Sequence, residues 1–391
     1  MFTAQVIIVV CLLLIVAYVF DLTSHKTKIP SVILLMALGY AVKELAYLFN
    51  IHIPDLNPIL PFLGTIGLIL IVLEGSLEIE LTHNALPIIK KSMWMAFVPM
   101  FIVAFGIGSA FHYFTGADFM KSLINAVPFC IISSAIAIPS VNNWSKRDKS
   151  FVIYESSLSD ILGVILFNFI ALNTTFTAQT YIQFVLEILL ILVISFVATI
   201  ALSFVLSRLQ HRIKFGPILI FVVLIYEISK YYHLPALVFI MIFGLVIGNI
   251  NKIKENKYLA YFKPEKLKTE VNTFKEIVVE ATFLIRTLFF LLFGFLIELN
   301  EVFNYHTIFW STSIVLGILL VRVIVLSFLK LSIGKFMFIA PRGLITILLF
   351  LSIDPSNRIP LVNNSMVIQV ILISVLLMML GVIFTKSNQE D

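Results

Sequence analysis

Charged residues are scarce in this sequence: Asp, Glu, Lys and Arg make up 13% of its 391 residues, against about 25% in an ordinary soluble domain. Hydrophobic residues make up 60%. A soluble protein with this composition would expose large apolar patches and aggregate. The composition therefore excludes a soluble enzyme, a coiled coil and a disordered tail, and it predicts a helical membrane protein.

Cysteine and metal-binding patterns are almost absent as well. Cys11 and Cys130, the two cysteines, both lie in apolar runs, so no disulfide framework or CxxC metal site is expected. The seven histidines show no HxxxH or HExxH spacing, and the sequence contains no GxxxxGK[ST] phosphate-binding loop. We expect no cofactor, no enzymatic activity and no ATP-driven transport within this chain. The net charge of +5 comes from residues between apolar segments, which does not indicate a nucleic-acid partner.

Long apolar segments are what the sequence does contain, and a membrane-spanning helix needs about 20 predominantly apolar residues. Thirteen spans are predicted, at 3–20, 31–49, 59–77, 88–111, 122–141, 151–172, 181–206, 216–232, 234–249, 276–297, 306–329, 335–353 and 365–384. The first is interpreted as a retained span because no basic residue precedes it. The fold class is therefore an all-α polytopic membrane protein.

The basic residues predict the orientation of these spans. If the first span runs from outside to inside, Lys121, Lys230 and Arg358 flank the outer connections, whereas most of the 27 lysines and arginines flank the inner ones. This is the positive-inside pattern. We expect the N-terminus outside and the C-terminus in the cytoplasm. The short loops favour a bacterial inner membrane.

Thirteen spans also divide as six, one and six, which is the arithmetic of an inverted-topology repeat. On this interpretation residues 1–391 form one membrane domain, with a first repeat at about 1–173, a linker helix at about 181–206 and a second repeat at about 216–385. The fifth and twelfth spans occupy equivalent places. Each is interrupted, by Ser133-Ser134 to Pro139 and by Pro341-Arg342-Gly343. Matched interruptions of this kind predict discontinuous helices that cross at a midplane binding site.

Ionisable residues within spans indicate where function lies, because a charge at the centre of a membrane helix is costly. Asp160 lies near the middle of its span, and Ser156 and Ser157 share its helical face. A carboxylate with hydroxyl groups suits a small hard cation or a proton. Glu74 is a second candidate ligand, although a Glu near a span end can also reach the lipid headgroups. A buried Asp hydrogen-bonded by its own helix is the alternative for Asp160.

Three buried arginines need partners. Glu155 faces away from Asp160 on its helix, and we expect it to pair with Arg322 as a structural ion bridge. Arg342, at the break of the twelfth span, is expected to compensate the exposed carbonyls of the helix ends there. Arg286 has two possible interpretations. It compensates charge at the crossing, including that of an unoccupied Asp160, or it is an arginine that reaches along a cavity.

The stretch Tyr154-Glu155-Ser156-Ser157-Leu158-Ser159-Asp160 resembles the Gly-Glu-Ser-Leu-Leu-Asn-Asp motif of sodium/proton exchangers in the cation:proton antiporter superfamily. Four further stretches resemble the family in the same order: Leu73-Glu74-Gly75, Phe289 to Gly294, Arg322-Val323 and Arg342-Gly343. The fifth span departs from the family's Thr-Asp-Pro and carries Ser133-Ser134-Ala135, which is more like the potassium-efflux branch. No Asp-Asp pair of the electrogenic members is present.

The resemblance implies a cation/proton antiporter that uses Na⁺, K⁺ or Li⁺, with Na⁺ preferred. Asp160 would bind either a cation or a proton, with Ser156, Glu74, Ser133 and Ser134 as further oxygen ligands. A single carrier carboxylate favours one-for-one, electroneutral exchange. The resemblance also implies a homodimer in the lipid membrane, formed through a scaffold while the ion-carrying part moves.

Two other functions stay open from the sequence. The first is a sodium-coupled transporter of an organic anion with the same inverted-repeat plan, in which Arg286 or Arg342 would bind the substrate. The second is a non-transporting membrane sensor or scaffold, which the missing Thr-Asp-Pro keeps open.

Overall fold

The computed structural model describes residues 2–27, 29–49, 51, 55–56, 58–79, 86–172, 178–208, 215–232, 234, 236–249 and 264–384. Every regular element within those residues is a helix. Nine of the described helical stretches are long and apolar enough to cross a membrane, and two further apolar stretches are shorter. The prediction of an all-helical polytopic fold with about thirteen helices is confirmed.

Eleven helices correspond to uninterrupted predicted spans. They are α1 (Phe2–Thr27), α2 (Ser31–Leu48), α3 (Ile59–Glu78), α4 (Leu86–Thr115), α7 (Lys146–Leu172), α8 (Ala178–Arg208), α9 (Phe215–Tyr231), α10 (Ala236–Gly248), α11 (Pro264–Leu296), α13 (Tyr305–Phe328) and α16 (Asn364–Phe384).

Two helices differ from the predicted bounds for a simple reason. α11 begins at Pro264 instead of residue 276, because its first turns are rich in Lys and Glu, which favour a helix but do not register as apolar. The chain also forms a short helix, α12 (Leu299–Val302), between α11 and α13. Hydropathy alone cannot detect either feature.

The fifth and twelfth spans are broken, as predicted. The fifth consists of α5 (Phe119–Ala126), the 3₁₀ turn η2 (Val127–Cys130), an extended stretch and α6 (Ser134–Ser140). The twelfth consists of α14 (Ile333–Phe336), an extended stretch and α15 (Leu344–Ser352), followed by the 3₁₀ turn η4 (Pro355–Asn357). Pro128 and Pro341 have no N–H to continue a helical ladder, which favours the interruptions.

The two extended stretches meet each other. The backbone N–H of Ser133 donates to the carbonyl of Pro341 at 2.8 Å, so each break satisfies a polar group of the other. Backbone groups within a membrane need such internal partners. The approach is close: a Cβ on Gly343 would lie 2.7 Å from Oγ of Ser133. Glycine therefore allows the two broken spans to touch.

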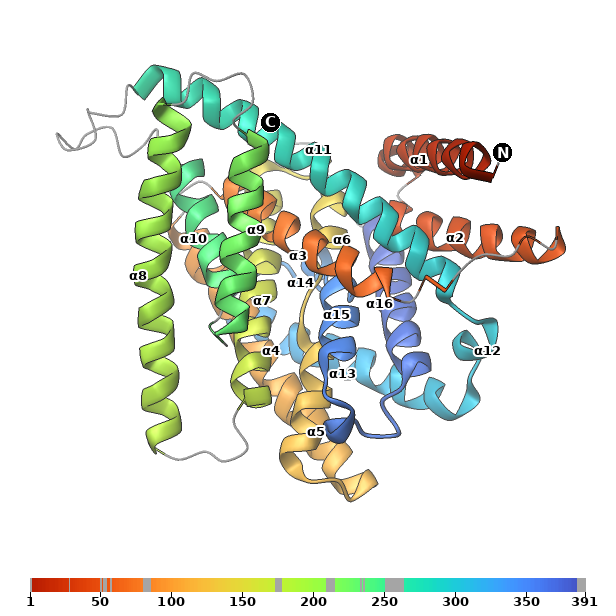
Figure 1. The fold of residues 1–391 in the computed structure, drawn as a ribbon. Coiled ribbons are helices and arrows are strands. Elements are labelled where there is room, and N and C mark those ends of the chain that lie inside the picture. The colour runs from red at the N-terminus through yellow and green to blue at the C-terminus, as the bar shows by residue number, and fades with distance from the viewer. Residues whose placement is uncertain are drawn as a thin grey trace.

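The helices pack as two groups. We call α4 to α7 with α13 to α16 the crossing group, and α1 to α3 with α8 to α11 the flanking group; most helix packing lies within each group. α3 bridges them, because it packs on α10 and α11 and also on α6, α7 and α15. In Figure 1, α8 stands at the left edge and α1 lies at the upper right, both at the periphery.

Within the flanking group, α2 and α11 approach each other through glycine. A Cβ on Gly39 would lie 2.9 Å from the backbone nitrogen of Phe295 and still closer to the carbonyl oxygen of Leu291. A Cβ on Gly294 would meet the backbone of Met36 in the same way. The two helix backbones therefore pack in direct contact, as small residues permit in membranes.

Gly39→Ala should lower the melting temperature of the purified protein in detergent, because a methyl group must push two backbones apart; the expected cost is about 1–3 kcal/mol. Gly106→Ala is the matched control, since nothing lies within 4 Å of its added Cβ, and alanine favours an exposed helix by roughly 1 kcal/mol. Thermal unfolding curves compare the two variants. Equal melting temperatures for both would contradict the packing described here.

Candidate functional site

Asp160 of α7 is buried, with 1% of its surface exposed. One carboxylate oxygen, Oδ2, accepts a hydrogen bond from Oγ of Ser134, the first residue of α6. The other oxygen, Oδ1, is also buried and has no hydrogen-bond partner among the residues that the structure describes. A buried polar atom without a partner is unusual and calls for an explanation. This oxygen has capacity for a proton or a cation.

Two hydroxyl groups hold the unwound backbone beside Asp160. Oγ of Ser159 accepts a hydrogen bond from the backbone N–H of Ile132 at 3.0 Å, and Oγ of Ser374 accepts from the N–H of Arg342 at 3.0 Å. Neither serine was predicted from the sequence to have a role. Their position on helices that pack against the two predicted breaks is the feature from which such a role could have been predicted.

The serines before Asp160 do not both face its carboxylate. Oγ of Ser156 donates to the carbonyl of Val152 at 2.8 Å, so it bonds to its own helix. Oγ of Ser157 is buried without a hydrogen-bond partner and lies 2.8 Å from where a Cβ of Gly75 would be. In the described contacts Ser134, and not Ser156, bonds to Asp160. Ser133 contributes its backbone to the crossing.

Glu155 and Arg322 form a buried, two-pronged ion pair, with nitrogen–oxygen distances of 2.5 and 3.0 Å. Nε of Arg322 also donates to the carbonyl of Phe336 in α14, at 2.8 Å. Both side chains are 2% exposed. The pair connects α7 with α13 and the start of the twelfth span, on the far side of α7 from Asp160.

Arg342 lies in the extended stretch between α14 and α15 and is buried. Its Nε and Nη1 atoms have no hydrogen-bond partner. Among the described residues, these two nitrogens do not donate to the carbonyls of the helix ends, so compensation of those carbonyls by Arg342 stays a prediction.

A cavity of about 160 Å³ lies next to this site. Ser134 is part of its wall, so one residue separates the cavity from the Asp160 carboxylate. The other polar residues that line it are Asp21, Glu74, Glu78, Asn142, Lys149 and Arg286. They come from both groups of helices and surround the end of the bundle where α3 ends and α7 begins. Three carboxylates and two cations give this wall a net negative charge.

Arg286 has a different partner from those expected. Its Nη2 atom lies 4.0 Å from Oδ1 of Asp21, at the end of α1. Glu74 lies in the same cavity wall as Arg286. Arg286 belongs to the flanking group and lines the cavity, which agrees with the second of the two interpretations made from the sequence, while compensation of an unoccupied Asp160 stays a prediction. Asp21 was not identified from the sequence.

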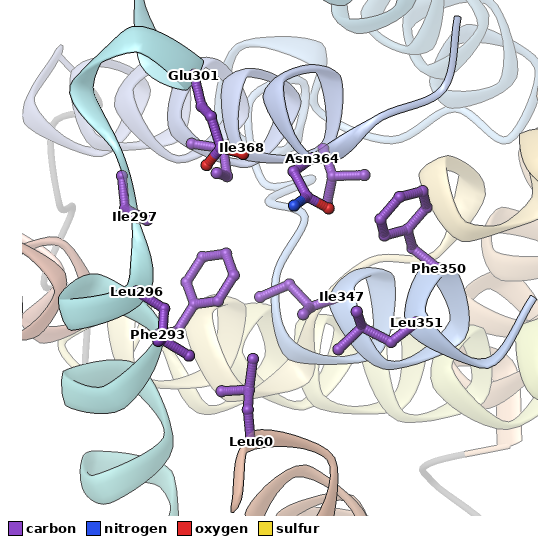
Figure 2. Close-up of a pocket in the computed structure, with 11 residues that line it drawn as sticks. Leu60, Phe293, Leu296, Ile297, Glu301, Ile347, Phe350, Leu351, Asn364 and Ile368 are labelled. Atoms are coloured by element: carbon purple, nitrogen blue, oxygen red, sulfur yellow. The ribbon is translucent and has the colours of Figure 1, made fainter. Parts of the chain in front are cut away.

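A second cavity, of about 100 Å³, lies at the opposite end of the bundle. Figure 2 shows Phe293 of α11 and Leu60 of α3 facing Ile347 of α15 across it. Most of its lining is apolar, with Glu301 and Asn364 as the polar exceptions. A cation crossing such a lining would lose its hydration without compensation. This cavity is therefore less suited to a cation than the cavity beside Ser134.

Comparison with solved structures shows that this chain has the fold of a known membrane antiporter. The sodium proton antiporter MjNhaP1 from Methanocaldococcus jannaschii, at pH 8, superposes with a TM-score of 0.71 at 17% identity, covering 97% of this chain and 100% of that chain. An electron-microscopy structure of the same antiporter gives a TM-score of 0.72 at 17% identity, covering 99% of each chain. Among curated proteins, none matches the chain by sequence.

The helical fold is therefore that of a multi-pass membrane antiporter. The family model described as "Sodium/hydrogen exchanger, transmembrane" matches residues 10–386, and the chain belongs to that family. Family and fold support an integral membrane protein that exchanges cations for protons. This activity is that of a transporter and not that of an enzyme.

Removal of one partner of the Glu155–Arg322 pair should destabilise the protein by about 3–5 kcal/mol, because a buried charge loses its compensation. Glu155→Gln and Arg322→Met should each lower the melting temperature and the yield of folded protein. The double variant should lose less than the sum of the two single variants. Thermal unfolding of all four proteins measures this coupling, and strict additivity would show that the two side chains do not interact.

Proposed function

We propose that this protein exchanges Na⁺ for H⁺, one for one, with Asp160 as the group that binds either ion. The observation that carries the proposal is the buried Oδ1 atom of Asp160, which has no hydrogen-bond partner and lies one residue from a negatively charged cavity. An ionised carboxylate at the centre of a span costs at least about 2.5–3.5 kcal/mol. Either a proton or a cation removes that cost.

The proposal includes a set of oxygen ligands. A Na⁺ ion would take oxygens from Asp160, Ser134 and Glu74, with the hydroxyl groups of Ser133 and Ser156 as further ligands after a rotamer change that breaks the bond of Ser156 to Val152. Oxygen ligands of this kind suit hard cations. Na⁺ is preferred over K⁺ and Li⁺ in this proposal. When Asp160 carries a proton, the Ser134 hydroxyl remains its hydrogen-bond partner.

Competition between the two ions produces the coupling. We assume that the crossing group changes position against the flanking group only when Asp160 is neutralised. A protein with neither ion bound then does not change conformation, and uncoupled leakage of ions is suppressed. One ionisable carrier group then moves one Na⁺ or one H⁺ each time. The net charge moved is zero, so exchange is electroneutral.

We also propose an orientation in the membrane, an inverted repeat and a dimer for this chain. The N-terminus lies outside and the C-terminus in the cytoplasm of a bacterial inner membrane, so the cavity beside Ser134 opens to the cytoplasm. Residues 1–173 and 216–385 are inverted repeats joined by a linker helix at 181–206. Two copies associate in the lipid membrane through the flanking group.

A sodium-coupled carrier of organic anions is supported less well. Such a substrate needs a cation that faces a cavity. Arg286 does face one, but Asp21 lies 4.0 Å away and Glu74 and Glu78 share the wall. Carboxylates outnumber cations there, which favours a cationic substrate.

Asp160→Asn should abolish exchange, because an amide can neither release a proton nor neutralise a cation. The assay uses proteoliposomes with an acidic interior and a pH-sensitive dye, to which Na⁺, K⁺ and Li⁺ are added in turn. Asp148→Asn is the matched control on the same helix: it removes an acid that pairs with Lys335 at the surface end of α7 and should keep exchange active. Wild-type rates for the variant Asp160→Asn, or no response of the wild type to any cation, would refute the proposal.

Electroneutral exchange predicts that the rate does not depend on membrane voltage. A potential set by a K⁺ gradient and valinomycin should leave the initial rate of Na⁺-driven alkalinisation unchanged, since no net charge crosses. A voltage-gradient dye confirms that the potential was present. A rate that rises with an inside-positive potential and falls with an inside-negative one would indicate that more than one proton leaves for each cation that enters.

A further inference from the structure

The cavity beside Ser134 contains a cation as part of its own wall. Arg286 is largely buried, with 14% of its side chain exposed, and it belongs to α11 of the flanking group. Its charge acts on Glu74, which lies in the same wall on α3. A guanidinium tethered beside a carboxylate competes with a mobile cation for that carboxylate. Binding of a cation at Glu74 therefore depends on where Arg286 is held.

Asp21 offers Arg286 a second carboxylate. The two side chains are 4.0 Å apart, and Asp21 is 33% exposed. Oγ of Ser31, the first residue of α2, donates to Oδ1 of Asp21 at 3.3 Å and helps to fix it. α1 packs on α2 and α11 of the flanking group, which brings Asp21 beside Arg286 in the cavity wall.

We propose that Asp21 is a positioning residue that holds the Arg286 guanidinium away from Glu74, which leaves Glu74 available to the transported cation. This inference rests on the proposed function, because it assumes that Glu74 shares the cation with Asp160. Without the charge of Asp21, Arg286 turns fully to Glu74 and acts as an internal competitor of the substrate.

Other charges in the cavity must be separated from this effect. Lys149 lies in the same wall, and Lys275 and Glu78 also act on Glu74. Any removed carboxylate makes the cavity less attractive to cations in general. Glu78→Gln is therefore the matched control: it removes one negative charge from the same wall without removing the partner of Arg286.

The experiment is a double-mutant cycle measured as apparent KM and maximal rate for Na⁺ in proteoliposomes. Asp21→Asn should raise the apparent KM by about tenfold, the size expected when a unit charge approaches a carboxylate by a few ångström in the effective dielectric of a protein. The maximal rate should change little. Asp21→Glu should keep a KM close to that of the wild type.

The Arg286→Gln background decides the mechanism. There Asp21→Asn should have no further effect on KM, because the internal competitor is gone, whereas Glu78→Gln should weaken binding in both backgrounds. Stabilisation of the purified variants against heat by NaCl gives an independent measure of binding, since a ligand that binds only the folded state raises its stability.

The outcomes distinguish a failure of this inference from a failure of the proposed function. An unchanged KM in the Asp21→Asn variant, or an equal rise with and without Arg286, overturns this inference while the proposed exchange stands. A fall in maximal rate alone would make Asp21 a structural residue and also overturn it. A wild type that neither exchanges nor is stabilised by Na⁺ overturns the proposed function, and this inference with it.

Discussion

The hydrogen bond from the Ser133 N–H to the Pro341 carbonyl is the interaction on which the site depends. A membrane interior offers no water to an unwound backbone, so a broken helix is tolerated only where protein groups replace the missing bonds. Here two breaks satisfy each other, and the hydroxyl groups of Ser159 and Ser374 bond to the adjoining amides. After the break, α6 begins at Ser134, whose hydroxyl group donates to the Asp160 carboxylate.

The polar groups around the cavity are divided between two bodies of helices. Asp160 and Ser134 belong to the crossing group, whereas Glu74, Arg286 and Asp21 belong to the flanking group. The Glu155–Arg322 pair lies wholly within the crossing group and ties α7 to α13. A displacement of one group against the other would therefore change the ligands around a cation without disturbing that pair. In the proposed exchange, this division would be the physical basis for access from alternate sides.

The sequence was sufficient for those features that depend on local composition. Apolar runs located the spans, and the Pro and Ser residues of the fifth and twelfth spans located the breaks. Features that depend on long-range geometry were out of reach. Asp21 and Arg286 meet only through the packing of α1 on α11, and Ser156 shares the helical face of Asp160 but bonds to the carbonyl of Val152 instead. Periodicity gives the face of a helix and not the rotamer of a side chain.

The position of Arg286 bears on the number of protons exchanged. A transport site that uses two carboxylates, Asp160 and Glu74, could take up two protons for each cation, and exchange would then carry charge. A guanidinium beside Glu74 supplies positive charge that cannot be released, because arginine stays protonated in proteins. That fixed charge favours the ionised form of Glu74 when the cation leaves, whereas burial of the carboxylate opposes it. In the proposed one-for-one exchange, Asp160 is the carboxylate whose charge is neutralised anew in each half of the cycle. The fixed charge of the flanking group would then contribute to the stoichiometry together with the single Asp in α7.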